Sequence, residues 1–153
     1  MNEYWNGEPM MRIGVSNRRG TILLVEDEAF VREVTSEILR AEGYGLWTAT
    51  NSAEAEQIFN RHEEEIDLLL TDVVLPGKTG RVLATEMRRK NPRIRVLYVT
   101  GYAEQMKALQ GSGEECLAKP FSSEVLLGRL KGVMAPRELR LEGRETMRVC
   151  AGA

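Results

Sequence analysis

Residues 66–77 read IDLLLTDVVLPG, and this stretch decides the expected fold. The apolar run up to Thr71 has no polar alternation, which is typical of a strand buried on both faces in a parallel sheet. Pro76-Gly77 then breaks the chain into a loop. Asp72 is therefore expected at the carboxyl end of a buried strand, where an aspartate by itself is most often a turn or capping residue.

Four further short runs predict strands that alternate with helices. The strands are expected at 21–25, 46–50, 95–100 and 115–118, and the run at 66–71 comes third in chain order. A predicted helix follows each strand. This alternation indicates an α/β fold, a doubly wound parallel sheet of five strands with helices on both faces and right-handed crossovers.

The helices are predicted from apolar residues that recur at helical spacing. In chain order these residues are Phe30, Val31, Val34, Ile38 and Leu39; Ala55, Ile58 and Phe59; Val82, Leu83 and Met87; and Val125, Leu126, Leu130, Val133 and Met134. The helix at 103–109, fourth in order, is expected to make at most two turns. Asn51 or Ser52 can cap the second helix, and Ser122 the last.

Composition excludes several classes of function. The chain has 153 residues, of which 42% are hydrophobic and 29% charged, and its formal net charge is −2. This balance gives no general attraction to nucleic acid or to an anionic membrane, and no apolar segment has the length of a membrane span. Cys116 and Cys150 cannot build a disulfide framework, and with His62 as the single histidine there is no zinc constellation. We predict a cytoplasmic protein without membrane insertion.

The chain is expected to form one domain at 20–135. Residues 1–19 are predicted to be a flexible leader, and residues 136–153 a short tail with no output domain. A basic group at 88–95 could contact nucleic acid, but a solvated helix end is the stronger interpretation. Its members are Arg88, Arg89, Lys90, Arg93 and Arg95.

Ligands of open parallel sheets bind at the carboxyl ends of the strands. The predicted strands deliver Glu26 and Asp27, Asp72, Thr100 and Lys119 to that edge. Each alone has an ordinary explanation: the acids suit a helix N-terminus, and Lys119-Pro120 suits a loop. Their coincidence at the ends of four strands favours a functional site.

The residue types at this edge indicate phosphoryl transfer. Three carboxylates packed together repel one another, and Mg²⁺, which prefers oxygen ligands and shares its shell with phosphate, resolves the conflict. Lys119 and Thr100 are suited to phosphate oxygens. Asp72, between the two groups, can act as a nucleophile and form an acyl phosphate.

The motifs LVEDE, LLTDVVLPG, VTGY and AKPF resemble the receiver domain of two-component response regulators over about residues 21–134. The resemblance implies a flavodoxin-like sheet of order 2-1-3-4-5. It also implies that Asp72 accepts a phosphoryl group from a sensor histidine kinase or a histidine phosphotransfer protein. The phosphate would then either switch the binding of a downstream protein partner or be relayed to a histidine phosphotransfer protein.

The resemblance further assigns roles within the site. Asp27 would bind Mg²⁺ directly, Glu26 through water, and the Val74 carbonyl would supply a third oxygen. Thr100 and Lys119 would bind the phosphoryl oxygens, and the Lys119-Pro120 bond would be cis.

The sequence departs from the family at particular positions. Cys116 replaces an aromatic residue that is usual in the fifth strand, and Lys78 lies where an apolar residue is common. The segment between Thr100 and Lys119 is short, and this is the face that often serves output and homodimer formation. The sequence therefore allows a homodimer without predicting one.

Two rival functions remain beside a signalling domain that is not itself an enzyme. A magnesium-dependent phosphohydrolase would need a second acid just after Asp72, where Val73 and Val74 stand. A phosphorylation-independent adaptor would keep the fold without the switch.

Overall fold

The strand β5 (Leu68–Asp72), which ends in Asp72, is the central strand of a five-stranded parallel sheet. The structure is a computed structural model that describes residues 4–5, 8–9 and 19–136. The sheet order is β4-β3-β5-β6-β7, where β3 is Thr21–Val25, β4 Gly45–Ala49, β6 Arg95–Thr100 and β7 Cys116–Ala118. In chain order this is 2-1-3-4-5, so the predicted α/β class and strand order are confirmed.

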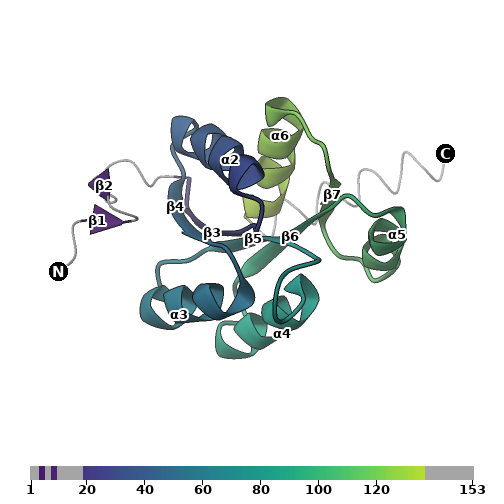
Figure 1. The fold of residues 1–153 in the computed structure, drawn as a ribbon, viewed down its shortest axis with the longest axis horizontal. Coiled ribbons are helices and arrows are strands. Elements are labelled where there is room, and N and C mark those ends of the chain that lie inside the picture. Colours follow the sequence, from purple (N-terminus) through teal and green to yellow (C-terminus); the bar gives the residue numbers. More distant parts are fainter. Residues whose placement is uncertain (1–3, 6–7, 10–18, 137–153) are drawn as a thin grey trace.

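Helices cover both faces of this sheet (Figure 1). On one face, α2 (Ala29–Ala41) packs against α6 (Ser123–Met134); on the other, α3 (Ser52–His62) packs against α4 (Gly80–Lys90). The helix α5 (Ala103–Gly111) contacts β7 and β6 at one edge. Every residue of β3 and β5 is buried, which agrees with their uninterrupted apolar runs.

The predicted leader contains a short antiparallel pair, β1 (Tyr4–Trp5) and β2 (Glu8–Pro9). The other residues before 19 and the tail from 137 lie outside the described residues. The flexible leader and the absence of an output domain therefore stay predictions. In the part of the chain that the structure describes, no helix has the length and apolar character needed to cross a bilayer.

Several apolar residues expected on the inner faces of helices lie at the surface instead. In α4, the buried residues are Gly80, Leu83, Ala84 and Met87, whereas Val82 is 45% exposed. Val125 of α6 is similarly exposed beside the buried Leu126, and Phe30 and Val34 of α2 are also exposed. The helical period explains this, because consecutive residues point about 100° apart. In α4 the buried side is centred on Leu83 and Ala84, so Val82 lies at its margin.

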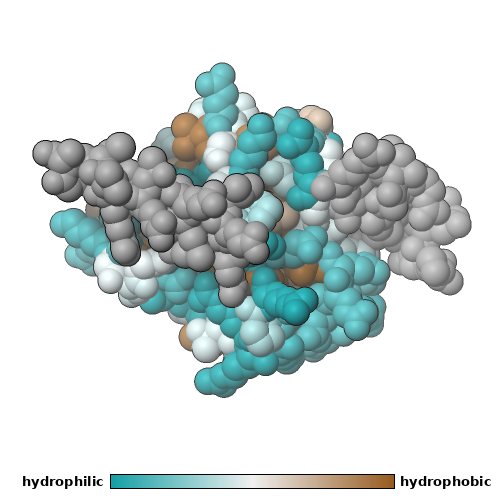
Figure 2. Space-filling view, turned by 180° about the vertical axis from the view of Figure 1, so that it is seen from behind, coloured by the Kyte–Doolittle hydropathy of each residue, from teal (hydrophilic) through white to brown (hydrophobic). Residues whose placement is uncertain are grey.

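Two other predicted features can be compared with the structure. The helix α5 has nine residues, more than the two turns expected, since one turn takes about 3.6 residues. The caps Asn51 and Ser122 are confirmed, because their side chains accept the N–H groups of Glu54 and Val125. Figure 2 shows the face turned away in Figure 1, whose described part is mostly hydrophilic with small separate hydrophobic areas.

Gly80, the first residue of α4, lies against the end of β5. Its N–H donates to the Val73 carbonyl over 2.8 Å. A Cβ at this position would lie 2.1 Å from the Asp72 carbonyl oxygen, a distance that no side chain can adopt without movement of the backbone. Glycine thus allows the start of α4 to approach the residue at the end of the central strand.

Replacing Gly80 with Ala is expected to lower the free energy of unfolding by about 1–3 kcal/mol, because the new methyl group overpacks this contact. Gly128→Ala is the matched control, since a Cβ at Gly128 in α6 meets no atom within 4 Å. Alanine there should raise the free energy of unfolding by about 0.5–1 kcal/mol through its helix propensity. Urea unfolding measures both, and shifts of the same sign would contradict this account.

Candidate functional site

The register of the sheet brings the predicted site residues to one edge. Val25 pairs with Thr71, Asp72 with Val99, and Thr100 with Ala118. The residues that follow or end these strands therefore lie side by side. Glu26 and Asp27 follow β3, Asp72 ends β5, Thr100 ends β6, and Lys119 follows β7.

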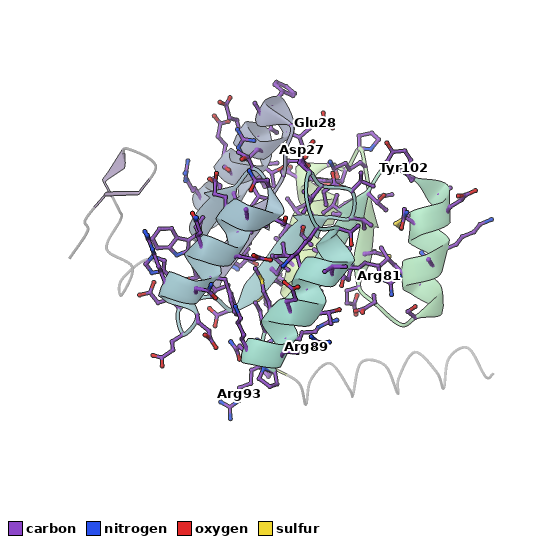
Figure 3. The ribbon with its side chains drawn as sticks, turned by 60° about the horizontal axis from the view of Figure 1, so that its bottom comes forward. Asp27, Glu28, Arg81, Arg89, Arg93 and Tyr102 are labelled. Atoms are coloured by element: carbon purple, nitrogen blue, oxygen red, sulfur yellow. The ribbon has the colours of Figure 1, made fainter. Side chains whose placement is uncertain are left out.

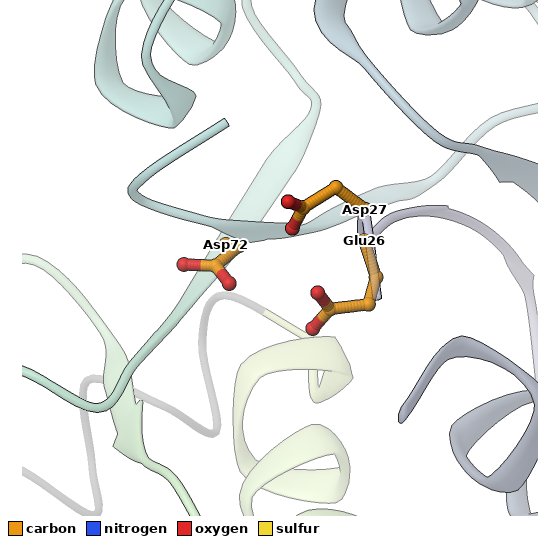
Figure 4. A group of neighbouring side chains, drawn as sticks. All are labelled: Glu26, Asp27 and Asp72. Carbon is orange, nitrogen blue, oxygen red and sulfur yellow. The ribbon is translucent and has the colours of Figure 1, made fainter. Parts of the chain in front are cut away.

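Three carboxyl groups converge at this edge (Figure 4). Each of Glu26, Asp27 and Asp72 offers an oxygen, and these oxygens all lie within 4.8 Å of one another. Glu26 and Asp72 are buried, with 3% and 9% of their surface exposed, whereas Asp27 is exposed. In Figure 3, Asp27 and Tyr102 lie at the same end of the molecule, and Arg93 lies at the opposite end.

Lys119 joins two of these acids. Its Nζ lies 2.5 Å from Glu26 Oε1 and 2.6 Å from Asp72 Oδ2. The Lys119 N–H donates to the Thr100 carbonyl over 2.9 Å, which extends the β6–β7 ladder by one residue. The Lys119-Pro120 bond is cis, as expected. Burial opposes the charge on Lys119, but the hydrogen bonds to Asp72 and Glu26 outweigh it and raise the pKa of this ammonium group.

The Asp72 carboxylate is held from two sides. Its Oδ1 accepts the N–H of Val74 over 3.2 Å, while Oδ2 accepts from Lys119. The structure thus places the Val74 backbone beside Asp72. The role of the Val74 carbonyl as a metal ligand stays a prediction.

Thr100 reaches the same edge but does not join the group of acids. Its side chain is fully buried, and its hydroxyl accepts the N–H of Tyr102 over 3.1 Å. Within residues 19–136, this hydroxyl makes no hydrogen bond to Asp72 or Lys119.

The donor set fits a hard divalent cation. All three ligand groups are carboxylates, and together they carry more negative charge than the one ammonium of Lys119 balances. Burial raises the pKa of the Glu26 carboxyl, although the hydrogen bond from Lys119 opposes the shift. A cation among these oxygens would stabilise the ionised form, and Mg²⁺ suits such a site because it binds one or two carboxylates while keeping several waters.

The sequence model of the response regulator receiver domain matches residues 22–131. The chain belongs to the response regulator receiver family. Receiver domains are phosphoacceptor domains of two-component signalling, in which histidine kinases and phosphotransfer proteins are the partners. The match includes all the strands and helices of the five-stranded sheet domain except Thr21 of β3 and the last three residues of α6.

This receiver domain is similar to parts of longer signalling proteins. It is 33% identical over 117 residues to the aerobic respiration control protein ArcA of Escherichia coli strain K12, covering 74% of this chain and 48% of ArcA. It is 34% identical over 121 residues to the sensor kinase CckA of Brucella abortus, covering 77% of this chain and 13% of CckA. The chain thus spans about half the length of ArcA and a small part of CckA.

Solved structures share the receiver fold. The response regulator TrrA of Thermotoga maritima, in complex with Mg²⁺-BeF, superposes with a TM-score of 0.67 at 31% identity, covering 74% of this chain and 98% of that one. That relative was solved with a magnesium ion and a beryllium fluoride group.

Cys116 occupies the position in the fifth strand where receiver domains usually carry an aromatic residue. Cys116 of β7 is buried and pairs with Tyr98 of β6, whose ring is also buried. An aromatic side chain therefore lies on the neighbouring strand of this receiver domain, two residues before Thr100. Burial raises the pKa of the Cys116 thiol above its ordinary value.

Lys78 anchors the loop that follows Val74. Its Nζ lies 2.7 Å from Glu56 and 2.9 Å from Glu86, and its N–H donates to Ser52 Oγ over 2.9 Å. Ser52, one of two expected helix caps, thus binds this loop while Asn51 caps α3. In the basic group at 88–95, Arg88 forms a bidentate ion pair with Glu114.

Sequence reasoning missed Arg32 of α2. Its Nη1 donates to the backbone carbonyl of Glu26 over 2.9 Å and lies 3.5 Å from that of Asp27. A signal was present, since Arg32 is the fourth residue of α2, and a cation so close to a helix N-terminus is disfavoured by the helix dipole. Such a residue needs a specific acceptor nearby.

Proposed function

We propose that this receiver domain accepts a phosphoryl group on Asp72 from a sensor histidine kinase or a histidine phosphotransfer protein. The observation that carries the proposal is the position of the Asp72 carboxylate. It lies within 4.8 Å of the oxygens of Glu26 and Asp27, while Lys119 binds it over 2.6 Å. The carboxylate is thus oriented, partly shielded from water and flanked by a cation.

The transfer exchanges one bond at phosphorus. An Asp72 oxygen attacks the phosphorus of a phosphohistidine, the P–N bond breaks, and its electron pair stays with the imidazole nitrogen. Lys119 stabilises the charge on the phosphoryl oxygens, and Thr100 donates a hydrogen bond to them once its hydroxyl turns toward the site. Mg²⁺, held by Asp27, Asp72, the Val74 carbonyl and Glu26 through water, would neutralise charge at these oxygens.

The acyl phosphate then has two outcomes within this proposal. It alters the surface that a downstream protein recognises, or it passes to a histidine phosphotransfer protein. The proposal places the protein in the cytoplasm, with protein partners and without direct contact to nucleic acid.

Intact-mass analysis after incubation with acetyl phosphate and Mg²⁺ tests the proposal. We expect one added phosphoryl group in the parent protein and none in Asp72→Asn, which keeps the shape of the side chain but not the nucleophile. The label should be lost in hydroxylamine, which cleaves acyl phosphates. An unchanged mass of the folded parent with Mg²⁺ bound would support the adaptor function instead.

The phosphohydrolase is the weaker rival because the residues after Asp72 cannot supply a general acid. Val73 is buried, and Val74, which is half exposed, has an aliphatic side chain. Sustained turnover of a phosphomonoester such as p-nitrophenyl phosphate, lost in Asp72→Asn, would favour it.

A further inference from the structure

The turn that carries Glu26 and Asp27 is not held by an ordinary helix cap. The helices α3, α4 and α6 are preceded by the N-cap residues Asn51, Thr79 and Ser122, whose side chains each accept a backbone N–H of the first turn. In α2 the N-cap residue is Glu28, and its side chain makes no such bond. The Glu28 N–H instead donates to Glu26 Oε2 over 3.2 Å, so an acid of the site takes part in the turn.

Of the three acids, Asp27 has the fewest contacts that hold its carboxylate in place. It is exposed, and in the part of the chain that the structure describes its carboxylate makes no hydrogen bond or ion pair. Glu26 and Asp72, by contrast, both bind Lys119. Repulsion from these two carboxylates favours movement of the Asp27 side chain toward solvent. Its position therefore depends on its backbone.

Arg32 supplies the contact to that backbone. Its Nη1 donates to the Glu26 carbonyl over 2.9 Å and lies 3.5 Å from the Asp27 carbonyl. One guanidinium group thus contacts the backbone of both acidic residues and leaves their carboxylates free of this contact. Arg32 is half buried and belongs to a helix that contacts β4, β3 and α6 and whose buried residues are Thr35, Ser36 and Leu39. The anchor is thus attached to a rigid part of the fold.

We infer that Arg32 is a positioning residue for the magnesium site, holding the Glu26-Asp27 turn so that both carboxylates face Asp72 before the ion binds. This inference rests on the proposed function, because it concerns the metal that the phosphoryl transfer requires. Preorganisation of ligands raises affinity since the protein does not have to order them when the ion arrives.

A purely electrostatic role for Arg32 would have the opposite effect on Mg²⁺ affinity. If Arg32 acted only through its positive charge, it would repel Mg²⁺, and its removal would tighten binding of the ion. If it acts by positioning, its removal weakens binding despite the lost repulsion. The direction of the change therefore separates the two interpretations.

Arg32→Met tests the inference because methionine keeps an apolar stem without the donor or the charge. We expect the dissociation constant for Mg²⁺, measured by titration calorimetry, to rise about three- to tenfold. This is less than the roughly 10–100-fold change seen for groups that contact a ligating atom's side chain directly, because Arg32 acts through the backbone. Arg32→Lys, with the charge and one donor, should bind Mg²⁺ with an intermediate dissociation constant. Arg89→Met makes the same change at an exposed position of α4 far from Asp27 (Figure 3) and should leave the constant unchanged.

Two further measurements separate positioning from other roles. In acetyl phosphate labelling, Arg32→Met should raise the Mg²⁺ concentration for half-maximal rate while the rate at saturating Mg²⁺ stays near that of the parent. The melting temperature in EDTA should also stay near the parent value.

Unchanged or tighter Mg²⁺ binding in Arg32→Met would overturn the inference. A rate deficit that persists at saturating Mg²⁺, or a large loss of melting temperature in EDTA, would also overturn it, since the role would then be chemical or structural. Failure of the proposed function looks different: the parent itself would bind no Mg²⁺ or take no label.

Discussion

Replacing Lys119 with Met is expected to lower the free energy of unfolding without metal by about 3–5 kcal/mol, because two buried carboxylates lose the ammonium between them. Glu26 and Asp72 would remain buried at 3% and 9% exposure beside the charge of Asp27. Mg²⁺ should restore most of this loss and should bind more tightly than in the parent, since it no longer competes with a cation. Urea unfolding with EDTA and with Mg²⁺ measures both effects.

The same substitution should slow labelling by acetyl phosphate by about 100-fold or more at saturating Mg²⁺. The reason is that a charged donor to the phosphoryl oxygens is lost, and removal of one such donor commonly has an effect of about 10²–10³. Lys107→Met in α5 is the control, because Lys107 is exposed and, among the described residues, the lysine that pairs with Glu26 and Asp72 is Lys119. A Lys119→Met protein as stable in EDTA as the parent would show that the acids do not depend on this lysine.

Replacing Asp27 with Asn is expected to raise the dissociation constant for Mg²⁺ by about 100-fold or more. Loss of a group that only supports a ligand typically changes metal affinity by about 10–100-fold, and loss of a ligand should change it more. Under the proposed function, the metal would lose a direct carboxylate ligand and one unit of opposing charge. Folding should not suffer, because Asp27 is exposed and its loss relieves repulsion within the acid group. Stability in EDTA is therefore expected to equal or exceed that of the parent.

Glu28→Gln is the matched control for Asp27→Asn. Glu28 is also exposed and also precedes α2, but it does not belong to the group whose oxygens lie within 4.8 Å of one another. Titration calorimetry should show a small change for Glu28→Gln. Similar losses of Mg²⁺ affinity in the two variants would mean that the general negative charge of this turn, rather than ligation by Asp27, attracts the ion.

The strands were predictable because their physical signal is local. In β3 and β6 an apolar run ends abruptly at a polar residue, and the predicted bounds, 21–25 and 95–100, are those of the structure. The exposed positions Phe30, Val34 and Val82 were not predictable in the same way. Periodicity shows that a helix has an apolar side, but the crossing of helix and sheet decides which edge of that side is covered.

The acids and Lys119 could be placed together from the sequence because parallel strands present their carboxyl ends at one edge. The anchors behind them could not. Arg32 binds backbone carbonyls, and Gly80 is required by a carbonyl oxygen of Asp72. A carbonyl belongs to every residue, so the side-chain pattern can mark Arg32 as unusual for a first helical turn but does not identify its acceptor. The pairing of Lys119 with both Glu26 and Asp72 emerges only in three dimensions.

The hydrogen bond between Tyr102 and Thr100 has a consequence for how the site communicates with the surface. The Thr100 hydroxyl is the acceptor for the N–H of Tyr102, the residue immediately before α5, and that helix has no side-chain cap. If the hydroxyl rotates to meet a phosphoryl group, the N–H loses its acceptor and the entrance to α5 is released. Tyr102 is 62% exposed, so a partner protein could contact the released residue directly. Phosphorylation of the buried Asp72, as proposed above, would thereby change the shape of the domain surface at Tyr102.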